Sequence, residues 1–166
     1  AVGMKPVASG CDWREGQLHN ADVDAHRRAG NVDAPLSWVS PYRFELAISP
    51  HLAACQAGVS IDIGHLVTCA DQLEHLADIV LIEGAGGWLA PLSDSTCMED
   101  LAKALVAPVI LVVGMRLGCL NHAMLSVRAI RHSGLPLVGW VANQVDPAMQ
   151  CYAENLTWLQ QAIPAP

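Results

Sequence analysis

The sequence predicts an α/β fold in which helices cover both faces of a doubly wound, mostly parallel sheet. Three segments are continuously apolar, and such runs indicate strands that are buried on both faces; they span 79–82, 109–114 and 137–143. Helical segments alternate with these strands, as they do in proteins built on a parallel sheet. The length of 166 residues fits a single α/β domain over 1–166.

The N-terminal half contains a further strand and three helices. Residues 4–7 are expected to form the strand, which runs into a turn over 8–10. The stretch 11–40 is polar, and we expect loops there around one short helix. The three helices are expected at 21–28, 51–57 and 63–76. Pro50 marks the start of the second helix, and Gly58 marks its end.

The C-terminal half adds three helices between and after the strands. Thr96 and Glu99 resemble a capping box that opens a helix running to about Leu105. A helix over about 121–132 follows the second strand, and Gly134 ends it. Pro147 is expected to open the last helix, which reaches about Ala162.

Composition argues against two classes of partner. The net charge of −7 disfavours a nucleic-acid partner, because neutralising phosphates requires clustered Lys and Arg. No apolar run approaches the roughly 20 residues of a membrane span, so no membrane partner is expected. The six cysteines include no Cys-x-x-Cys pair, which fits reduced thiols in a cytoplasmic protein.

The segment 79–88 carries the strongest indication of a site. Glu83 ends an apolar strand, and open α/β sheets bind ligands at the carboxyl ends of their strands. Gly84, Gly86 and Gly87 allow the backbone to approach a ligand closely. A carboxylate at this position is suited to Mg²⁺, which prefers oxygen ligands beside substrate phosphates. The alternative is an ordinary strand end followed by a flexible turn.

Other polar residues lie in or after the first strand. A lysine at a strand end, such as Lys5, suits an anionic ligand, although a lysine taken alone is more often solvated at the surface. Ser9 and Asp22 follow it and are candidates for the same edge. Each of Asp22, Asp24 and Asp33 is, taken alone, more typical of a helix cap or a solvated charge than of a metal ligand.

Two further candidates follow the second and third strands. The segment Gly118–Asn121 begins a helix, and its free N–H groups suit a carboxylate, although Asn121 as a helix cap explains it equally well. Asn143 ends the third strand, where its amide suits the edge of a purine or the turn through Asp146.

Several other chemistries lack their motifs. The sequence contains no Gly-x-Ser-x-Gly elbow, no His-Glu-x-x-His metal motif and no Gly-x-Gly-x-x-Gly fingerprint. His122 near Cys119 is more typical of a helix surface than of a zinc site. No Gly-x-x-x-x-Gly-Lys-[Ser/Thr] phosphate loop occurs within 1–166.

Taken together, the segments resemble the dethiobiotin synthetases, a family of P-loop NTPases in biotin biosynthesis. The resemblance covers nearly the whole chain and is carried by four stretches: Gly3–Gly10 (GMKPVASG), Glu83–Trp88 (EGAGGW) with Pro91–Ser93, Pro108–Gly114 with Leu117–His122, and Gly139–Asn143 (GWVAN). It implies a P-loop NTPase-like fold whose first strand, P-loop and last segment lie outside 1–166. We therefore expect these residues to be an incomplete domain that binds ATP poorly.

The resemblance implies an ATP- and Mg²⁺-dependent reaction that joins CO₂ or bicarbonate to 7,8-diaminononanoate and closes a cyclic urea. It also implies a homodimer, because the family binds the substrate carboxylate with the partner subunit. The implied roles are Lys5 in catalysis; Asp22 and Glu83 on the metal; Ser9, Gly84, Ala85, Gly118, Cys119, Leu120 and Asn121 on the substrate; and Glu83, Gly84, Ala85, Gly86, Gly87 and Asn143 on the nucleotide.

Two alternatives remain open from the sequence. One is a relative without a P-loop that is catalytically inactive and acts as a binding module. The other is a different member of the same NTPase superfamily, such as a cobyrinic-acid amidating synthetase domain or a MinD-like ATPase. Metal-dependent nucleotide binding tests the first alternative, and the choice of amine or acid acceptor tests the second.

Overall fold

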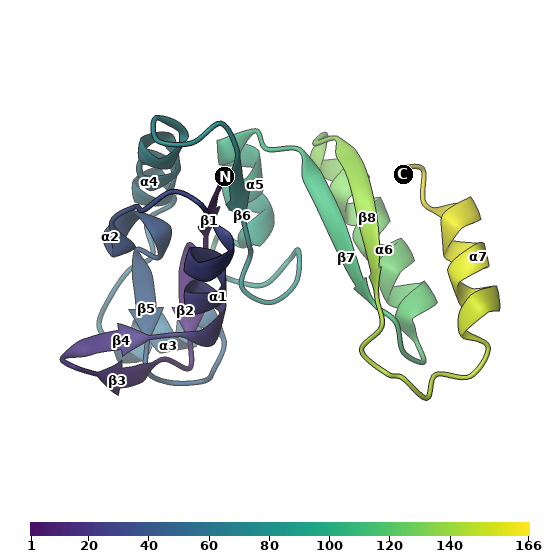
Figure 1. The fold of residues 1–166 in the computed structure, drawn as a ribbon, viewed down its shortest axis with the longest axis horizontal. Coiled ribbons are helices and arrows are strands. Elements are labelled where there is room, and N and C mark those ends of the chain that lie inside the picture. The colour runs from purple at the N-terminus through teal and green to yellow at the C-terminus, as the bar shows by residue number, and fades with distance from the viewer. The chain divides into compact units, whose positions relative to one another are not determined.

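The computed structural model describes residues 1–166, which fold as two compact units, Ala1–Leu105 and Val106–Pro166 (Figure 1). Three strand pairs are parallel, one is antiparallel, and seven helices complete the units. The predicted α/β class with mostly parallel strands is confirmed, and it is consistent with a doubly wound fold. One domain over 1–166 stays a prediction.

In the unit Ala1–Leu105, two consecutive short strands take different partners. β1 (Val2–Met4) pairs in parallel with β6 (Val80–Ile82), and β2 (Val7–Ser9) pairs in parallel with β5 (Tyr42–Phe44). The helices of this unit are α1 (Ala21–Ala29), α2 (Leu36–Val39), α3 (Pro50–Gln56), α4 (Ile63–Glu74) and α5 (Met98–Leu105). All four helices predicted in this part of the chain are confirmed within two residues at each end, a normal margin; the sequence did not indicate α2.

The single strand predicted near the N-terminus is instead two strands, because the chain changes partners between them. The N–H of Lys5 donates to the carbonyl of Val39 at 2.8 Å, and Pro6 has no N–H to donate. The carbonyl of Met4 still accepts from the N–H of Glu83 at 2.8 Å. Lys5 therefore lies at the carboxyl end of β1, beside the residue that follows β6.

The polar stretch after β2 contains a hairpin that was predicted to be loop. β3 (Asp12–Arg14) and β4 (Gln17–His19) pair antiparallel across a two-residue turn. Glu15 and Gly16 in that turn both have positive φ, 50° and 79°, as a type I′ turn requires. All of β3 is exposed, so the sequence lacks the apolar alternation that identifies a strand.

The capping box of α5 lies one residue later than predicted. Thr96 Oγ1 contacts Ser93 Oγ at 2.7 Å, and Glu99 bonds other side chains, so neither caps the helix. Instead Asp100 Oδ2 accepts from the N–H of Cys97 at 2.8 Å. Asp100 thus satisfies a backbone donor that the start of a helix leaves without an intrahelical partner.

Replacing Asp100 with alanine is expected to lower the free energy of unfolding by about 1 kcal/mol, the usual cost of a lost cap. Hydrogen bonds from the backbone N–H and thiol of Cys97 lower the pKa of Asp100. The ionised group therefore stabilises the fold above its unfolded-state pKa, and this contribution disappears as pH falls through the lower folded-state pKa. Thermal unfolding of D100A at neutral and acid pH, with exposed Asp94→Ala as control, measures the loss. An equal loss at both pH values would contradict the capping role.

The unit Val106–Pro166 contains two parallel strands and two helices. β7 (Val109–Gly114) and β8 (Leu137–Asn143) occupy the predicted segments. The predicted burial on both faces is not observed, because α6 and α7 pack on the face that carries Val113, whereas Ile110 and Val112 on the other face of β7 are 52% and 60% exposed. α6 (Cys119–Ser133) starts two residues before the predicted position and ends at Gly134 as predicted. α7 (Tyr152–Ala162) ends where the sequence indicated.

The last helix does not begin at Pro147 as predicted. Asp146 closes a turn there. Its Oδ1 accepts from the N–H of Ala148 at 2.9 Å, and its backbone carbonyl accepts from the N–H of Met149 at 3.2 Å. Cys151 then has a positive φ of 52°. The proline therefore belongs to a turn that precedes the helix.

Each unit has its own apolar core. In Ala1–Leu105 one cluster lies among β1, α1, α2 and α4, and a second lies among β2, β5, α3, α4 and α5. In Val106–Pro166 the core joins α6 and α7 to β7 and centres on Val113, Val127 and Leu159. None of the helices combines the length and the apolar character that crossing a bilayer requires.

Candidate functional site

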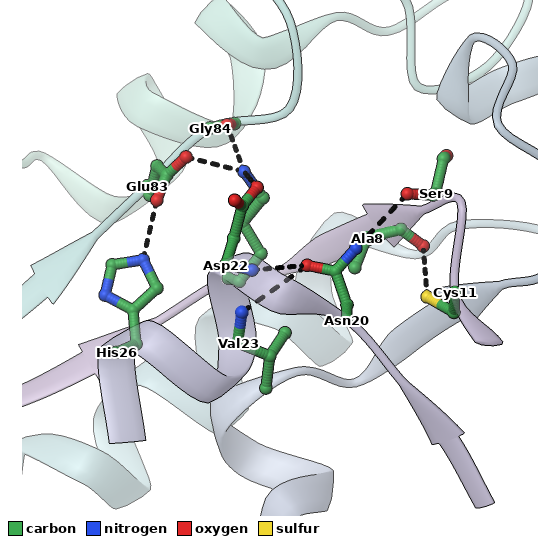
Figure 2. Close-up of polar contacts among 10 residues, drawn as sticks. Ala8, Ser9, Cys11, Asn20, Asp22, Val23, His26, Glu83 and Gly84 are labelled. Carbon is green, nitrogen blue, oxygen red and sulfur yellow. Dashed lines mark hydrogen bonds and ion pairs between the residues drawn. The ribbon is translucent and has the colours of Figure 1, made fainter. Parts of the chain in front are cut away.

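A buried lysine lies at the carboxyl end of β1. Lys5 is only 6% exposed, so the interpretation of this residue as a solvated surface lysine is wrong. Its Nζ lies 2.6 Å from Glu83 Oε1 and 2.8 Å from Asp22 Oδ2, and it donates to the carbonyl of Gly84 at 3.3 Å. Asp22, Glu83 and Gly84 lie close together in Figure 2. An ammonium group has three donors, so an anionic ligand must exchange with one of these acceptors.

Three elements position this cluster. Lys5 links β1 to β2, and Glu83 follows β6, whose parallel pairing with β1 puts both strand ends at one edge of the sheet. Asp22 lies in the first turn of α1, where Asn20 is the N-cap and accepts from the N–H groups of Asp22 and Val23. The Asp22 carboxylate is not used as a cap and is free to face Lys5.

The two carboxylates keep the lysine charged. Burial of Lys5 lowers the pKa of its ammonium group, but hydrogen bonds and Coulombic attraction with Asp22 and Glu83 outweigh that effect and raise the pKa above its usual value. Lys5 is therefore a fixed cation whose charge is balanced by the carboxylates of Asp22 and Glu83. A buried cation with exchangeable acceptors can neutralise phosphate or carbamate oxygens.

A fourth side chain, which sequence reasoning missed, completes the cluster. The Nε2 of His26 lies 2.7 Å from Glu83 Oε2, the carboxylate oxygen that Lys5 does not contact (Figure 2). His26 comes four residues after Asp22 on α1, and residues spaced in this way share one face of a helix. That spacing is the signal that identifies His26 once Asp22 is a candidate.

Ser9 ends β2 and is joined to the start of α1, the helix that carries Asp22. Its carbonyl accepts from Asn20 Nδ2 at 3.3 Å, which connects it to the start of α1 (Figure 2). Its Oγ is buried and has no hydrogen-bond partner within the chain. Since a buried hydroxyl normally has a partner, Ser9 has an unused donor and acceptor for a ligand.

The loop after Glu83 divides into a packed part and an open part. The methyl group of Ala85 packs in the apolar core, so a ligand would meet its backbone rather than its side chain. Gly86 has a positive φ of 81°, and nothing lies within 4 Å of the position that a Cβ would take at Gly87. The loop is therefore accessible at Gly87.

Asp22 and Glu83 fit a magnesium ion that a nucleotide helps to hold. Their side chains are 54% and 47% exposed, and both already face the same cation, Lys5 Nζ. No group of three or more His, Cys, Asp or Glu side chains with metal-site geometry occurs in the chain. Mg²⁺ normally takes one or two carboxylates together with substrate phosphates and water, so two protein ligands suffice.

The aspartates near Asp22 have other neighbours. Asp24 Oδ1 lies 3.8 Å from His19 Nδ1, and Asp33 Oδ1 lies 3.6 Å from Arg27 Nη2. The structure therefore separates Asp22 from the two aspartates with which the sequence grouped it.

The remaining predicted residues lie in the unit Val106–Pro166. Gly118 has a φ of 92° and begins α6 without a side-chain cap. Asn121 lies within the first turn of α6, so its interpretation as the helix cap is wrong. Asn143 is the register partner of Gly114, its side chain is exposed, and the following turn is closed by Asp146 instead. Whether these residues meet the Lys5 cluster stays a prediction.

Comparisons with known proteins give relatives that match nearly the whole chain. A family profile described as "AAA domain" matches residues 2–166. The chain is 46% identical over 166 residues to the ATP-dependent dethiobiotin synthetase BioD of Aromatoleum aromaticum, covering 100% of this chain and 74% of the relative. It is 47% identical over 165 residues to the protein of the same name from Cellvibrio japonicus, with coverages of 99% and 72%. The Xylella fastidiosa protein of that name is 45% identical over 166 residues, with coverages of 100% and 74%.

Proposed function

The chain belongs to the dethiobiotin synthetase family, and we propose that it catalyses the ATP-dependent synthesis of dethiobiotin in biotin biosynthesis. The observation that carries this proposal is the buried ammonium group of Lys5 between the carboxylates of Asp22 and Glu83. Phosphoryl transfer depends mainly on positioning and on neutralising charge, and this cluster supplies a fixed cation at a ligand-binding sheet edge.

The proposed substrates are 7,8-diaminononanoate, CO₂ or bicarbonate, and ATP. One amine nitrogen attacks CO₂ and loses a proton, which gives a carbamate. A carbamate oxygen then attacks the γ-phosphorus of ATP, and the bond to the bridging oxygen of ADP breaks. The second amine attacks the carbonyl carbon and gives up a proton, the C–O bond to the phosphoryl group breaks, inorganic phosphate leaves and can carry that proton, and the urea ring closes.

Lys5 is the proposed catalytic residue. Its ammonium group would exchange one of its present acceptors for a carbamate or γ-phosphate oxygen, whose negative charge it offsets in a mostly buried setting. Asp22 and Glu83 would hold Mg²⁺, which neutralises phosphate charge when bound. Ser9, with its unpartnered Oγ, would donate to or accept from the substrate.

The other proposed contacts use backbone groups and one amide. Gly84, Ala85, Gly86 and Gly87 would pass close to the substrate and the phosphates. Asn143, which is exposed at the end of β8, would contact adenine. The start of α6, Gly118–Asn121, would bind the substrate carboxylate of the partner subunit in a homodimer, supported by the uncapped first turn of that helix.

A cytoplasmic location is part of the proposal. All six cysteines are free thiols, and Cys55 and Cys151 are exposed. Exposed unpaired thiols are typical of a compartment that keeps cysteine reduced.

The test is an assay of the full-length protein with ATP, Mg²⁺, 7,8-diaminononanoate and ¹⁴C-labelled bicarbonate. We expect labelled dethiobiotin and phosphate in equal amounts, and neither product when the diamine is omitted. Phosphate release with a different amine or acid acceptor would indicate another NTPase of this superfamily. Folded protein without metal-dependent nucleotide binding would indicate a binding module and would overturn the proposal.

A further inference from the structure

One side chain of the cluster has no role in the proposed reaction. The side chain of His26 forms no hydrogen bond with Lys5 or Asp22, and its one polar contact joins Nε2 to Glu83 Oε2 at 2.7 Å. Because a carboxylate oxygen only accepts hydrogen bonds, the Nε2 of His26 must be the donor. The side chain of His26 is 13% exposed, so the surrounding protein holds the ring in place.

The two oxygens of Glu83 are held by different groups. Oε1 faces Lys5 Nζ at 2.6 Å, and Oε2 accepts from His26. Glu83 itself is about half exposed, and the terminal torsion of a glutamate has broad minima. A donor at each oxygen fixes the plane of the carboxylate, whereas Lys5 alone leaves the group free to turn about its contact.

The approach of α1 to β1 makes this contact possible. A Cβ added at Gly3 would lie 2.7 Å from the Cβ of His26, closer than real side chains approach. The absence of a side chain at Gly3 therefore lets α1 pack directly on β1, and α1 carries both Asp22 and His26. The distance between α1 and β1 therefore sets the position of Asp22, one proposed metal ligand. It also sets the position of His26, which donates to Glu83, the other proposed ligand.

We propose that His26 is a positioning residue that orients the Glu83 carboxylate through the hydrogen bond to Oε2, and thereby raises the affinity of Asp22 and Glu83 for a divalent cation. The proposal rests on the proposed function, because that function assigns the metal to these two carboxylates. Groups that orient metal ligands without touching the metal typically contribute 10- to 100-fold to metal affinity or activity.

The test compares His26→Ala with His26→Gln in the full-length protein. Glutamine keeps an N–H donor near the position of Nε2, and alanine removes it. His75→Ala, at an exposed position at the end of α4 without a side-chain hydrogen bond, is the matched control. Manganese is the probe: its free concentration is followed by electron paramagnetic resonance during titration in the presence of adenylyl imidodiphosphate. Circular dichroism and thermal unfolding establish that each variant is folded.

We expect H26A to raise the Kd for Mn²⁺ by 10- to 100-fold, whereas H26Q stays within about 3-fold of the unsubstituted protein and H75A is unchanged. In the dethiobiotin assay H26A should need more Mg²⁺ for half-maximal rate, with an unaltered KM for 7,8-diaminononanoate. That pattern separates a weakened metal site from a general disturbance of the substrate site.

Two outcomes overturn the positioning role. One is an H26A variant that binds Mn²⁺ as tightly as the unsubstituted protein, and the other is an H26Q variant as impaired as H26A, which would make the ring's bulk the cause. Either result leaves the proposed function standing if dethiobiotin is formed. Conversely, Mn²⁺ binding that depends on His26 in a protein that makes no dethiobiotin would support the positioning role and overturn the proposed function.

Discussion

Replacing Lys5 with methionine is expected to lower kcat for dethiobiotin formation by about 10²- to 10³-fold, the usual cost of removing one fixed group that stabilises developing charge. Methionine keeps the length and apolar contacts of the buried stem but removes the ammonium group between Asp22 and Glu83. Steady-state kinetics with saturating ATP and Mg²⁺ measure the effect. Lys103→Met is the matched control, because Lys103 is the chain's other lysine and forms only an exposed pair with Glu99.

The result for Lys5→Arg separates charge from shape. Arginine restores the positive charge, but its planar guanidinium group does not reproduce the compact ammonium contacts with Glu83 Oε1 and Asp22 Oδ2. We therefore expect partial recovery at most. A K5M variant that keeps its activity within a few-fold of the unsubstituted protein would show that Lys5 holds the carboxylates together without touching the reacting groups.

Replacing Glu83 with glutamine is expected to lower activity by a similar factor of about 10²- to 10³-fold, because one neutral amide replaces the charged partner of Lys5 and a proposed metal ligand. The shape of the side chain is retained, so the loss reports charge rather than packing. Most of the loss should appear as a higher Mg²⁺ requirement. Rates measured over a range of Mg²⁺ concentrations test this, with Glu74→Gln, an exposed position on α4, as control.

A different dependence on Mg²⁺ would contradict the metal assignment of Glu83. If the E83Q variant loses kcat but keeps the same half-saturating Mg²⁺ concentration, Glu83 acts through Lys5 alone. In that case Asp22, the other carboxylate on Lys5, becomes the residue to test for metal binding.

The parts of the fold that could be predicted are those marked by a continuous apolar segment. The strands at 109–114 and 137–143 were confirmed because apolar runs without alternation leave few other interpretations. The hairpin of β3 and β4 was missed because its first strand is exposed and carries no such pattern. The break between β1 and β2 was missed because it depends on the hydrogen bond from Lys5 to Val39, a contact far away in the sequence.

The proximity of Lys5 and Glu83 was predictable from the order of the strands. Lys5 and Glu83 end adjacent parallel strands, so strand pairing alone brings them together. His26 was not predictable to the same degree, because its contact depends on how closely α1 lies against β1 and not on any motif. Helix starts were the least accurate feature, with errors of one to five residues. The start of α5 depends on the cap by Asp100, that of α6 on the backbone of Gly118, and that of α7 on the turn closed by Asp146.

The close packing of α1 on β1 has a consequence for interpreting natural variation at position 3. Gly3 lies in a buried strand and bears no functional group, yet any side chain there would force α1 away from β1 and move Asp22 and His26 with it. A variant at this position is therefore expected to lower stability and to displace two side chains of the site at the same time. In a genetic survey it would appear as a neutral-looking core change that makes the cell depend on added biotin.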